Sequence, residues 1–155
     1  MGPELSDPQT RTARIARTAR SDPPRTGLPS RTAPLPATAD RKEALATARR
    51  AVELAADKKA SDIVLLDIAA LTTVADYFVI CSGTSERQLG AVADGIVEGL
   101  KGEGTRLLAR EGGPGSHWLL LDFGALIVHI MAPLERDYYQ LERLWAEAPL
   151  LLRVQ

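Results

Sequence analysis

Two apolar runs joined by a short reversal dominate the carboxy-terminal half of the chain. The first run covers residues 118–122, with the sequence WLLLD, and the second covers residues 125–131, with the sequence ALIVHIM. Phe123-Gly124 between them is typical of a turn, so the pattern predicts a β-hairpin. Alternation divides the side chains into two sets, Trp118, Leu120 and Asp122 on one face and Leu119, Leu121 and Phe123 on the other. Because both sets contain large apolar groups, we expect the hairpin to lie inside a covered sheet or to show one face to a partner.

Helical periodicity predicts three amphipathic helices. They cover residues 40–57, 85–100 and 134–145. Ser85 and Gln88 have the spacing of a capping box at the start of the second helix. The apolar stripe of that helix consists of Leu89, Val92, Ala93, Ile96 and Leu100. The third helix ends before Pro149, and four large side chains share one of its faces: Leu134, Tyr138, Leu141 and Trp145.

Three further segments are predicted to be strands, and the resulting order of elements defines the fold class. They cover residues 62–68, 77–81 and 106–110. The order α-β-β-α-β-β-β-α does not alternate strictly, so we expect an α/β fold with helices packed on a mixed β-sheet. We divide the chain into a tail at residues 1–39, one domain at 40–148 and a carboxy-terminal tail at 149–155.

The first 39 residues are rich in Pro, Thr, Arg and Ser and poor in large apolar groups. Such a segment buries too little surface to offset its chain entropy, so we expect a disordered tail. Its repeated arginines and hydroxyl residues resemble an organelle transit peptide, against which stand Glu4, Asp7 and the prolines. We favour a flexible extension that touches RNA weakly through its arginines.

Charge and cysteine content narrow the class of protein. Residues 1–40 hold six arginines against four acidic residues, and the remainder holds 13 Lys/Arg against 16 Asp/Glu. The mildly acidic remainder argues against a domain that coats nucleic acid. Cys81 is the single cysteine, which favours a reducing compartment, and no apolar run is long enough for a membrane span. We expect a cytoplasmic protein that binds neither DNA nor membrane, with an organellar location left open.

Several chemical sites are conceivable, but each lacks residues or a spacing that its chemistry requires. Cys81, His129 and Asp122 nominally supply a nucleophile, a base and an acid, but Cys81 lies within an apolar strand. A zinc site from Cys81, His117 and His129 has no recognised ligand spacing. The Asp122-Phe123-Gly124 tripeptide has no accompanying kinase motif, and the glycines of residues 112–115 precede a strand rather than a helix. We therefore predict no catalytic residue, no metal and no cofactor.

Residue types that dominate protein-protein interfaces remain. These are Trp118, Arg136, Tyr139 and Trp145. From alternation alone Trp118 is equally suited to fill the core or to anchor a partner. Asp122 is equally suited to accept hydrogen bonds from a partner or to cap the hairpin turn.

Five segments together resemble a known family. They are DYFVICSGTSERQ at residues 76–88, EG at 111–112, WLLLDFG at 118–124, VHI at 128–130 and RDYYQLERLW at 136–145. Their order and short spacing are similar to those of the Iojap family of ribosomal silencing factors, RsfS, over residues 41–148.

The resemblance implies a compact α/β fold, nucleotidyltransferase-like in outline but without a catalytic motif. It implies binding to the large-subunit ribosomal protein uL-fourteen, steric obstruction of subunit joining and repression of translation during nutrient limitation. Some relatives act in organelles and assist large-subunit assembly. The sequence itself agrees with the absence of a catalytic motif. Nucleotidyltransferases hold metal ions with an Asp-x-Asp pair after a Gly-Ser turn, and none follows Ser82-Gly83-Thr84-Ser85.

We therefore expect a steric inhibitor of subunit association that is not an enzyme. Its partner-binding residues are predicted to be Trp118, Leu119, Asp122, His129, Arg136 and Tyr139. One alternative is a small metal-dependent nucleotidyltransferase or hydrolase that uses Asp67, Asp76 or Glu135. Another is a large-subunit assembly factor. Whether the free protein forms a homodimer is left open.

Overall fold

The computed structural model describes residues 38–155, so the predicted tail lies almost wholly outside the described residues. The helices are α2 (Thr38–Asp57), α3 (Glu86–Gly102), α4 (Pro133–Tyr139) and α5 (Leu141–Leu144). The strands are β1 (Ser61–Asp67), β2 (Tyr77–Ser82), β3 (Ala109–Glu111), β4 (Trp118–Asp122), β5 (Leu126–Met131) and β6 (Leu150–Val154). In the described range no helix is long and apolar enough to cross a membrane.

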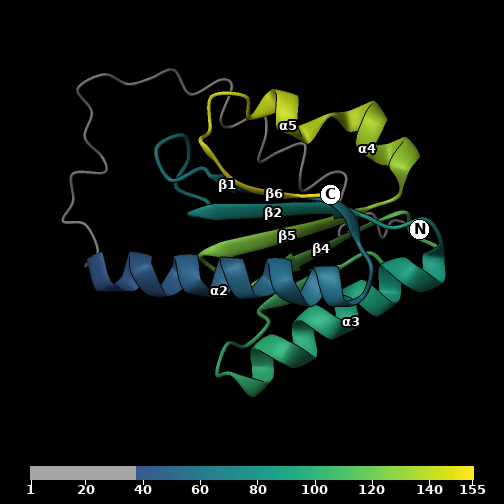
Figure 1. Cartoon of the computed structure of the whole chain (residues 1–155), viewed down its shortest axis with the longest axis horizontal. Coiled ribbons are helices and arrows are strands. Elements are labelled where there is room, and N and C mark those ends of the chain that lie inside the picture. The colour runs from purple at the N-terminus through teal and green to yellow at the C-terminus, as the bar shows by residue number, and fades with distance from the viewer. Residues whose placement is uncertain (1–37) are drawn as a thin grey trace, which may run out of the picture.

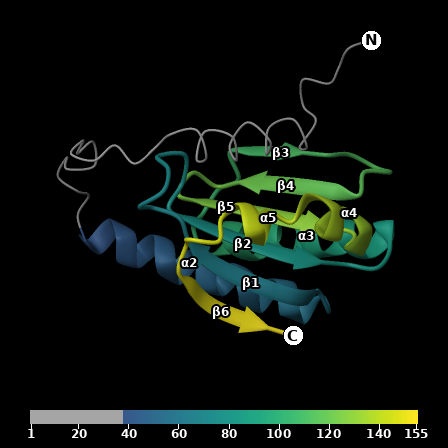
Figure 2. The same ribbon diagram turned by 90° about the horizontal axis from the view of Figure 1, so that it is seen from above.

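The strands form one six-stranded sheet in the order β3-β4-β5-β2-β1-β6 (Figure 2). Strands β2 and β5 are parallel, and the other neighbouring strands are antiparallel. The prediction of a mixed α/β sheet is confirmed. The predicted hairpin is also confirmed, because Trp118 pairs with Met131 and Asp122 pairs with Ile127.

Helices cover both faces of the sheet (Figure 1). Helices α2 and α3 lie on one face, and the shorter α4 and α5 lie on the other. The alternation predicted for the hairpin is confirmed, because Leu119 and Leu121 join the core under α2 and α3 whereas Trp118 and Leu120 join the core under α5. Every residue of β2 and β5 is buried, so these two strands form the centre of the molecule.

The predicted stripe and cap of α3 are both confirmed. The buried residues of this helix are Leu89, Val92, Ala93, Ile96 and Leu100. At its start the Ser85 hydroxyl accepts a hydrogen bond from the backbone N–H of Gln88 at 3.0 Å, and the Gln88 side chain accepts one from Thr84 N–H at 2.7 Å. The side-chain amide of Gln88 also donates to the Lys59 carbonyl at 2.9 Å, which fixes the helix start to the end of the loop after α2.

Several boundaries differ from the sequence prediction. Helix α2 begins at Thr38, two residues before the expected start, and β3 is a short strand at Ala109–Glu111 rather than residues 106–110. The single helix expected at residues 134–145 is two helices, because Gln140 adopts a left-handed conformation with φ 47° and ψ 57°. The expected carboxy-terminal tail contains strand β6, since its backbone pairs antiparallel with β1.

Candidate functional site

The chain leaves the parallel strands β2 and β5 in opposite directions. After β2 it enters α3 on one face of the sheet, and after β5 it enters α4 on the other (Figure 1). In open α/β sheets such a divergence lies beside the carboxyl ends of the strands, where ligands commonly bind. This end of the sheet is therefore the candidate site.

His117 links the starts of the two diverging helices. Its Nε2 atom is 3.4 Å from Oε2 of Glu86 in α3, and its Nδ1 atom is 3.4 Å from Oε2 of Glu135 in α4. The His117 side chain is 50% exposed, so these contacts are accessible to solvent. Among residues 38–155 no group of three His, Cys, Asp or Glu side chains has an arrangement that could hold a metal ion.

Trp118 lies in the interior behind α4. Its side chain is 2% exposed, and its indole N–H donates a hydrogen bond to Nδ1 of His129 at 3.2 Å. Tyr139 packs against the indole with 4.8 Å between ring centroids. Phe78 meets the His129 ring edge-on at 4.7 Å. Of the two interpretations of Trp118, the core residue is therefore confirmed by its burial, because an indole so enclosed has no surface left for a partner.

Burial fixes the charge state of His129. The residue is fully enclosed, and desolvation lowers the pKa of its imidazole to about 3 from an ordinary 6.5. Since Nδ1 accepts the bond from Trp118, the proton of the neutral ring resides on Nε2. That atom has no hydrogen-bond partner in the described part of the chain. His129 therefore acts as a neutral acceptor inside the core rather than as a general base.

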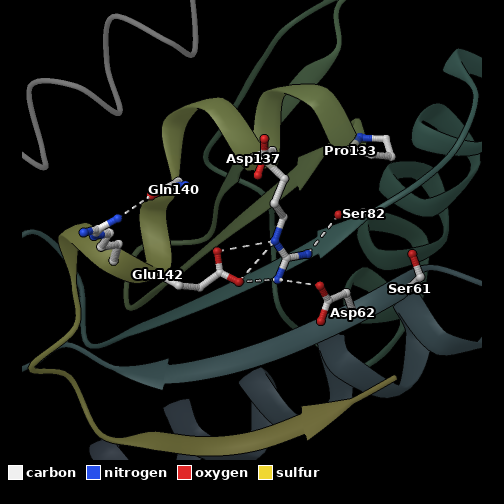
Figure 3. A pocket seen from close by; sticks show the side chains of 9 residues that line it. Ser61, Asp62, Ser82, Pro133, Asp137, Gln140 and Glu142 are labelled. Carbon is white, nitrogen blue, oxygen red and sulfur yellow. Dashed lines mark hydrogen bonds and ion pairs between the residues drawn. The ribbon is translucent and has the colours of Figure 1, made fainter.

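Arg136 attaches α4 to the sheet and to α5. The residue is 8% exposed, and its guanidinium donates to Glu142 at 2.6 Å and to the Ser82 hydroxyl at 2.9 Å. Asp62 of β1 lies 3.9 Å from the same group. Figure 3 shows Glu142, Ser82 and Asp62 converging on the guanidinium from three elements. The positive charge of Arg136 is therefore used within the molecule.

A hollow of about 460 Å³ lies beside this ion-pair cluster (Figure 3). It is lined by Ser61, Asp62, Ser82, Pro133, Arg136, Asp137, Gln140, Glu142 and Arg143. Arg143 donates to the side-chain oxygen of Gln140 at 3.2 Å. The hollow thus has a polar wall of mixed charge, in which the acidic residues Asp62, Asp137 and Glu142 alternate with the basic residues Arg136 and Arg143.

The structure brings four of the six predicted partner-binding residues together. Trp118, His129, Arg136 and Tyr139 lie beneath or within α4. Leu119 points to the opposite face and is 4% exposed. Asp122 lies at the far end of β4, where its side chain accepts the N–H of Gly124 at 2.8 Å and so caps the hairpin turn.

Two exposed residues of α4 were not among the predicted partner-binding residues. Leu134 is 80% exposed and Tyr138 is 78% exposed. Sequence analysis placed both on one apolar face together with Leu141 and Trp145, which are buried as expected. No sequence signal revealed that they are exposed. The helix break that leaves them outside the core occurs at Gln140, and glutamine has no strong tendency to break a helix.

The geometry argues against the nucleophile considered from the sequence. Cys81 belongs to the core under α2 and α3, whereas His129 contacts aromatic rings on the other face of the sheet. Burial raises the pKa of the Cys81 thiol to about 12. A thiol with that pKa, separated from the imidazole by the sheet, is not activated for attack.

The carboxylates proposed for an enzymatic alternative do not converge. Asp67 ends β1 beside Tyr77, at the opposite end of the parallel strands from Glu135, which follows β5. Asp67 caps the backbone of Ala69 at 3.1 Å and pairs with Arg41 at 3.4 Å. Asp76 precedes β2 at the same end as Asp67. The three therefore cannot act on one metal or substrate.

Similarity to known proteins shows the family of this chain. The family model described as "Ribosomal silencing factor during starvation", RsfS, matches residues 41–154. That range contains the whole sheet and nearly all of the four helices. The chain belongs to the RsfS family.

Individual relatives agree with this membership. The ribosomal silencing factor RsfS of Bacillus subtilis is 43% identical over 94 residues, which are 61% of this chain and 80% of that protein. A mouse protein named "Mitochondrial assembly of ribosomal large subunit protein 1" is 37% identical over 61% of this chain and 42% of its own length. A crystal structure from Chromobacterium violaceum superposes with a TM-score of 0.64 and 35% identity, covering 66% of this chain and 85% of that one. The RsfS relatives are named as silencing factors rather than as enzymes.

Proposed function

We propose that this RsfS-family protein binds the large ribosomal subunit through protein uL-fourteen and prevents the small subunit from joining it. In that role it represses translation in the cytoplasm when nutrients are limiting. The observation that carries the proposal is the family match over residues 41–154, the same residues that build the folded part of the molecule. Obstruction by a bound protein needs a stable surface and no reacting group. The ion pair, the hydrogen bond and the aromatic contact of α4 hold this helix in place and so keep its outer surface fixed.

Subunit joining is the direct test. Purified protein is added to separated large subunits before small subunits are supplied, and joined ribosomes are measured by sedimentation in a sucrose gradient. We expect the joined fraction to fall as the protein approaches one copy per large subunit. Adding the protein after joining should have much less effect, because its site would then be covered. Undiminished joining at saturating protein would disprove the proposal.

The partner is tested separately. Purified uL-fourteen should bind the protein directly, and large subunits that lack uL-fourteen should not retain it. Retention by such subunits would show that another component of the large subunit is the partner.

One observation favours a second function. The mouse relative is named for assembly of the mitochondrial large subunit. If this chain also assists assembly, its deletion should cause precursors of the large subunit to accumulate in well-fed cells, where silencing is not required. Normal large-subunit profiles in the deletion strain would exclude this role.

A further inference from the structure

Helix α4 exposes two large apolar side chains one turn apart. Leu134 is 80% exposed and Tyr138 is 78% exposed, more than any other large apolar residue in the described range. Positions four apart lie on the same face of a helix, so the two side chains are neighbours. Single exposed apolar residues are common and carry no message, whereas an adjacent pair on one helix is the usual form of a helical contact surface.

Folding does not account for this pair. At Gln140 the backbone enters the left-handed region and the chain changes direction, so Leu141 and Trp145 enter the core at 2% and 1% exposure. The same break leaves Leu134 and Tyr138 outside the core. Polar residues at these two positions would be compatible with the same fold, because neither side chain is covered by it. Their apolar character is therefore explained better by a partner than by stability.

The helix that carries the pair is held firmly. The Tyr138 ring meets Tyr139 edge-on at 4.8 Å between centroids, and Tyr139 packs on the buried Trp118 at 4.8 Å. On its other side α4 is attached through Arg136 to Ser82 and Glu142. A surface fixed in advance loses little conformational entropy when it binds.

Charge beside the pair indicates the chemistry of the partner. Asp137 is exposed and lies within α4 between Leu134 and Tyr138. It lines the hollow, whose other charged residues are Asp62, Glu142, Arg136 and Arg143. The positive charge of Arg136 is shared with Glu142 and Ser82 in the interior. Glu142 pairs with Arg136 and Asp62 pairs with Arg153, so Asp137 is the carboxylate of this group that faces solvent beside the ridge. An apolar ridge with a carboxylate at its side is complementary to an apolar patch bordered by lysine or arginine.

We propose that the outer face of α4, formed by Leu134, Asp137 and Tyr138, is the surface that contacts the large subunit. This proposal rests on the proposed function and adds the residues and the partner chemistry. The partner is a basic protein surface whose apolar side chains cover Leu134 and Tyr138 and whose Lys or Arg side chains reach Asp137. Trp118, Arg136 and Tyr139 are positioning residues that hold α4 against the sheet.

Paired substitutions test the apolar part. Binding to purified large subunits is measured by co-sedimentation for the wild-type protein, for Leu134→Ser with Tyr138→Ser, and for Leu108→Ser. Leu108 is the matched control, since it is 67% exposed but lies next to β3. We expect the double variant to bind at least about tenfold more weakly and the control to bind normally. Thermal unfolding of all three should be similar, because the substituted side chains are exposed.

Charge reversal tests the acidic part. Asp137→Lys should weaken binding, with the largest effect at low salt, because exposed charges are screened as ionic strength rises. Glu98→Lys is the control, because Glu98 is an exposed carboxylate on α3 at the other face of the sheet. Equal loss in both variants would indicate a general charge effect and would overturn the assignment to α4.

The outcomes separate this proposal from the proposed function. If the wild-type protein binds large subunits and the double variant binds equally well, the α4 surface is refuted while the silencing function stands. If the wild-type protein fails to bind, both fall. Sedimentation of the free protein examines a second copy as the occupant. A double variant that loses self-association but keeps full subunit binding would assign the surface to a dimer and overturn the proposal.

Discussion

At the residue scale, burial determines which ionisable groups respond to pH. Cys81 and His129 are both fully buried, and desolvation favours the neutral form of each. Their titrations are displaced in opposite directions, because the charged thiolate forms on losing a proton and the charged imidazolium forms on gaining one. For His129 the resulting change in stability falls within a pH range that can be measured.

Acid should destabilise the protein through His129. Its pKa is about 3 in the folded state against 6.5 ordinarily, so between these values the unfolded chain binds the proton and the folded chain does not. The stability that depends on a neutral ring is complete above pH 6.5 and is lost as the pH falls towards 3. We expect the free energy of unfolding to fall by roughly 1 kcal/mol for each pH unit below pH 6.5. Urea unfolding between pH 7 and pH 5 measures this loss.

Asparagine variants identify the responsible histidine. In His129→Asn the side-chain oxygen can replace Nδ1 as acceptor for Trp118, and the dependence on pH should flatten. His117→Asn removes the other histidine of the chain and is compared in the same experiment. An unchanged slope in His129→Asn would assign the acid sensitivity to another group.

Two glycines of α3 should respond oppositely to alanine. A Cβ atom at Gly90 would meet nothing within 4 Å, so Gly90→Ala should stabilise the helix by about 0.5–1 kcal/mol. At Gly99 the added atom would lie 2.6 Å from both terminal methyls of Leu54 in α2, so Gly99→Ala should destabilise by about 1 kcal/mol or more. Chemical denaturation measures both.

A third variant tests the cause of the Gly99 effect. Leu54→Ala removes the methyls that the new Cβ would meet, so Gly99→Ala should be less harmful in that background. Equal cost in both backgrounds would contradict the packing explanation. The close contact at Gly99 is between α2 and α3, which a helical period cannot reveal, since it describes one helix at a time.

At the element scale, strand β6 completes the sheet. It pairs with β1 along Ile63 to Leu66, and its Leu152 and Val154 pack against the core under α2 and α3. The sequence alone suggested a tail, because this five-residue run follows a helix and has no neighbouring turn partner to announce a hairpin. Its pairing partner lies some 90 residues earlier in the chain, and local pattern carries no information on such a pairing.

Removing β6 should therefore destabilise the whole domain. Truncation after Pro149 would expose the outer edge of β1 and the apolar surface that Leu152 and Val154 cover. We expect a loss of about 2 kcal/mol or more, measured as a lower thermal midpoint. Deletion of Gln155 alone is the control, because this residue follows the strand. An unchanged midpoint after the longer truncation would mean that β6 contributes nothing to stability.

At the scale of the whole molecule, two cores share one central pair of strands. Phe78 and Ile80 of β2 face the α4–α5 side, whereas Val79 and Cys81 face the α2–α3 side. Every side chain of this strand is buried, so neither core can be opened without disturbing the other. The domain is expected to unfold as one cooperative unit.

The single cysteine reports on that cooperativity. Cys81 is 0% exposed, and its raised pKa of about 12 disfavours the thiolate. Labelling by a thiol reagent should therefore require global unfolding, and its rate should depend on urea as steeply as unfolding itself. Labelling is followed by mass spectrometry. Rapid labelling in the absence of denaturant, with the fold intact by circular dichroism, would show that β2 opens locally.

Local sequence patterns were sufficient to predict the helices and strands, the sharing of their faces and the family segments. Leu119 and Trp118 were assigned to opposite faces because the strand period is local, and the stripe of α3 followed from the helical period for the same reason. What covers each face depends on contacts between segments that are distant in the chain. Burial of Trp118 depends on α4 lying over it, and exposure of Leu134 and Tyr138 depends on the backbone turn at Gln140. A period states which side chains point together, whereas contacts between distant segments decide whether they point into a core or towards a partner.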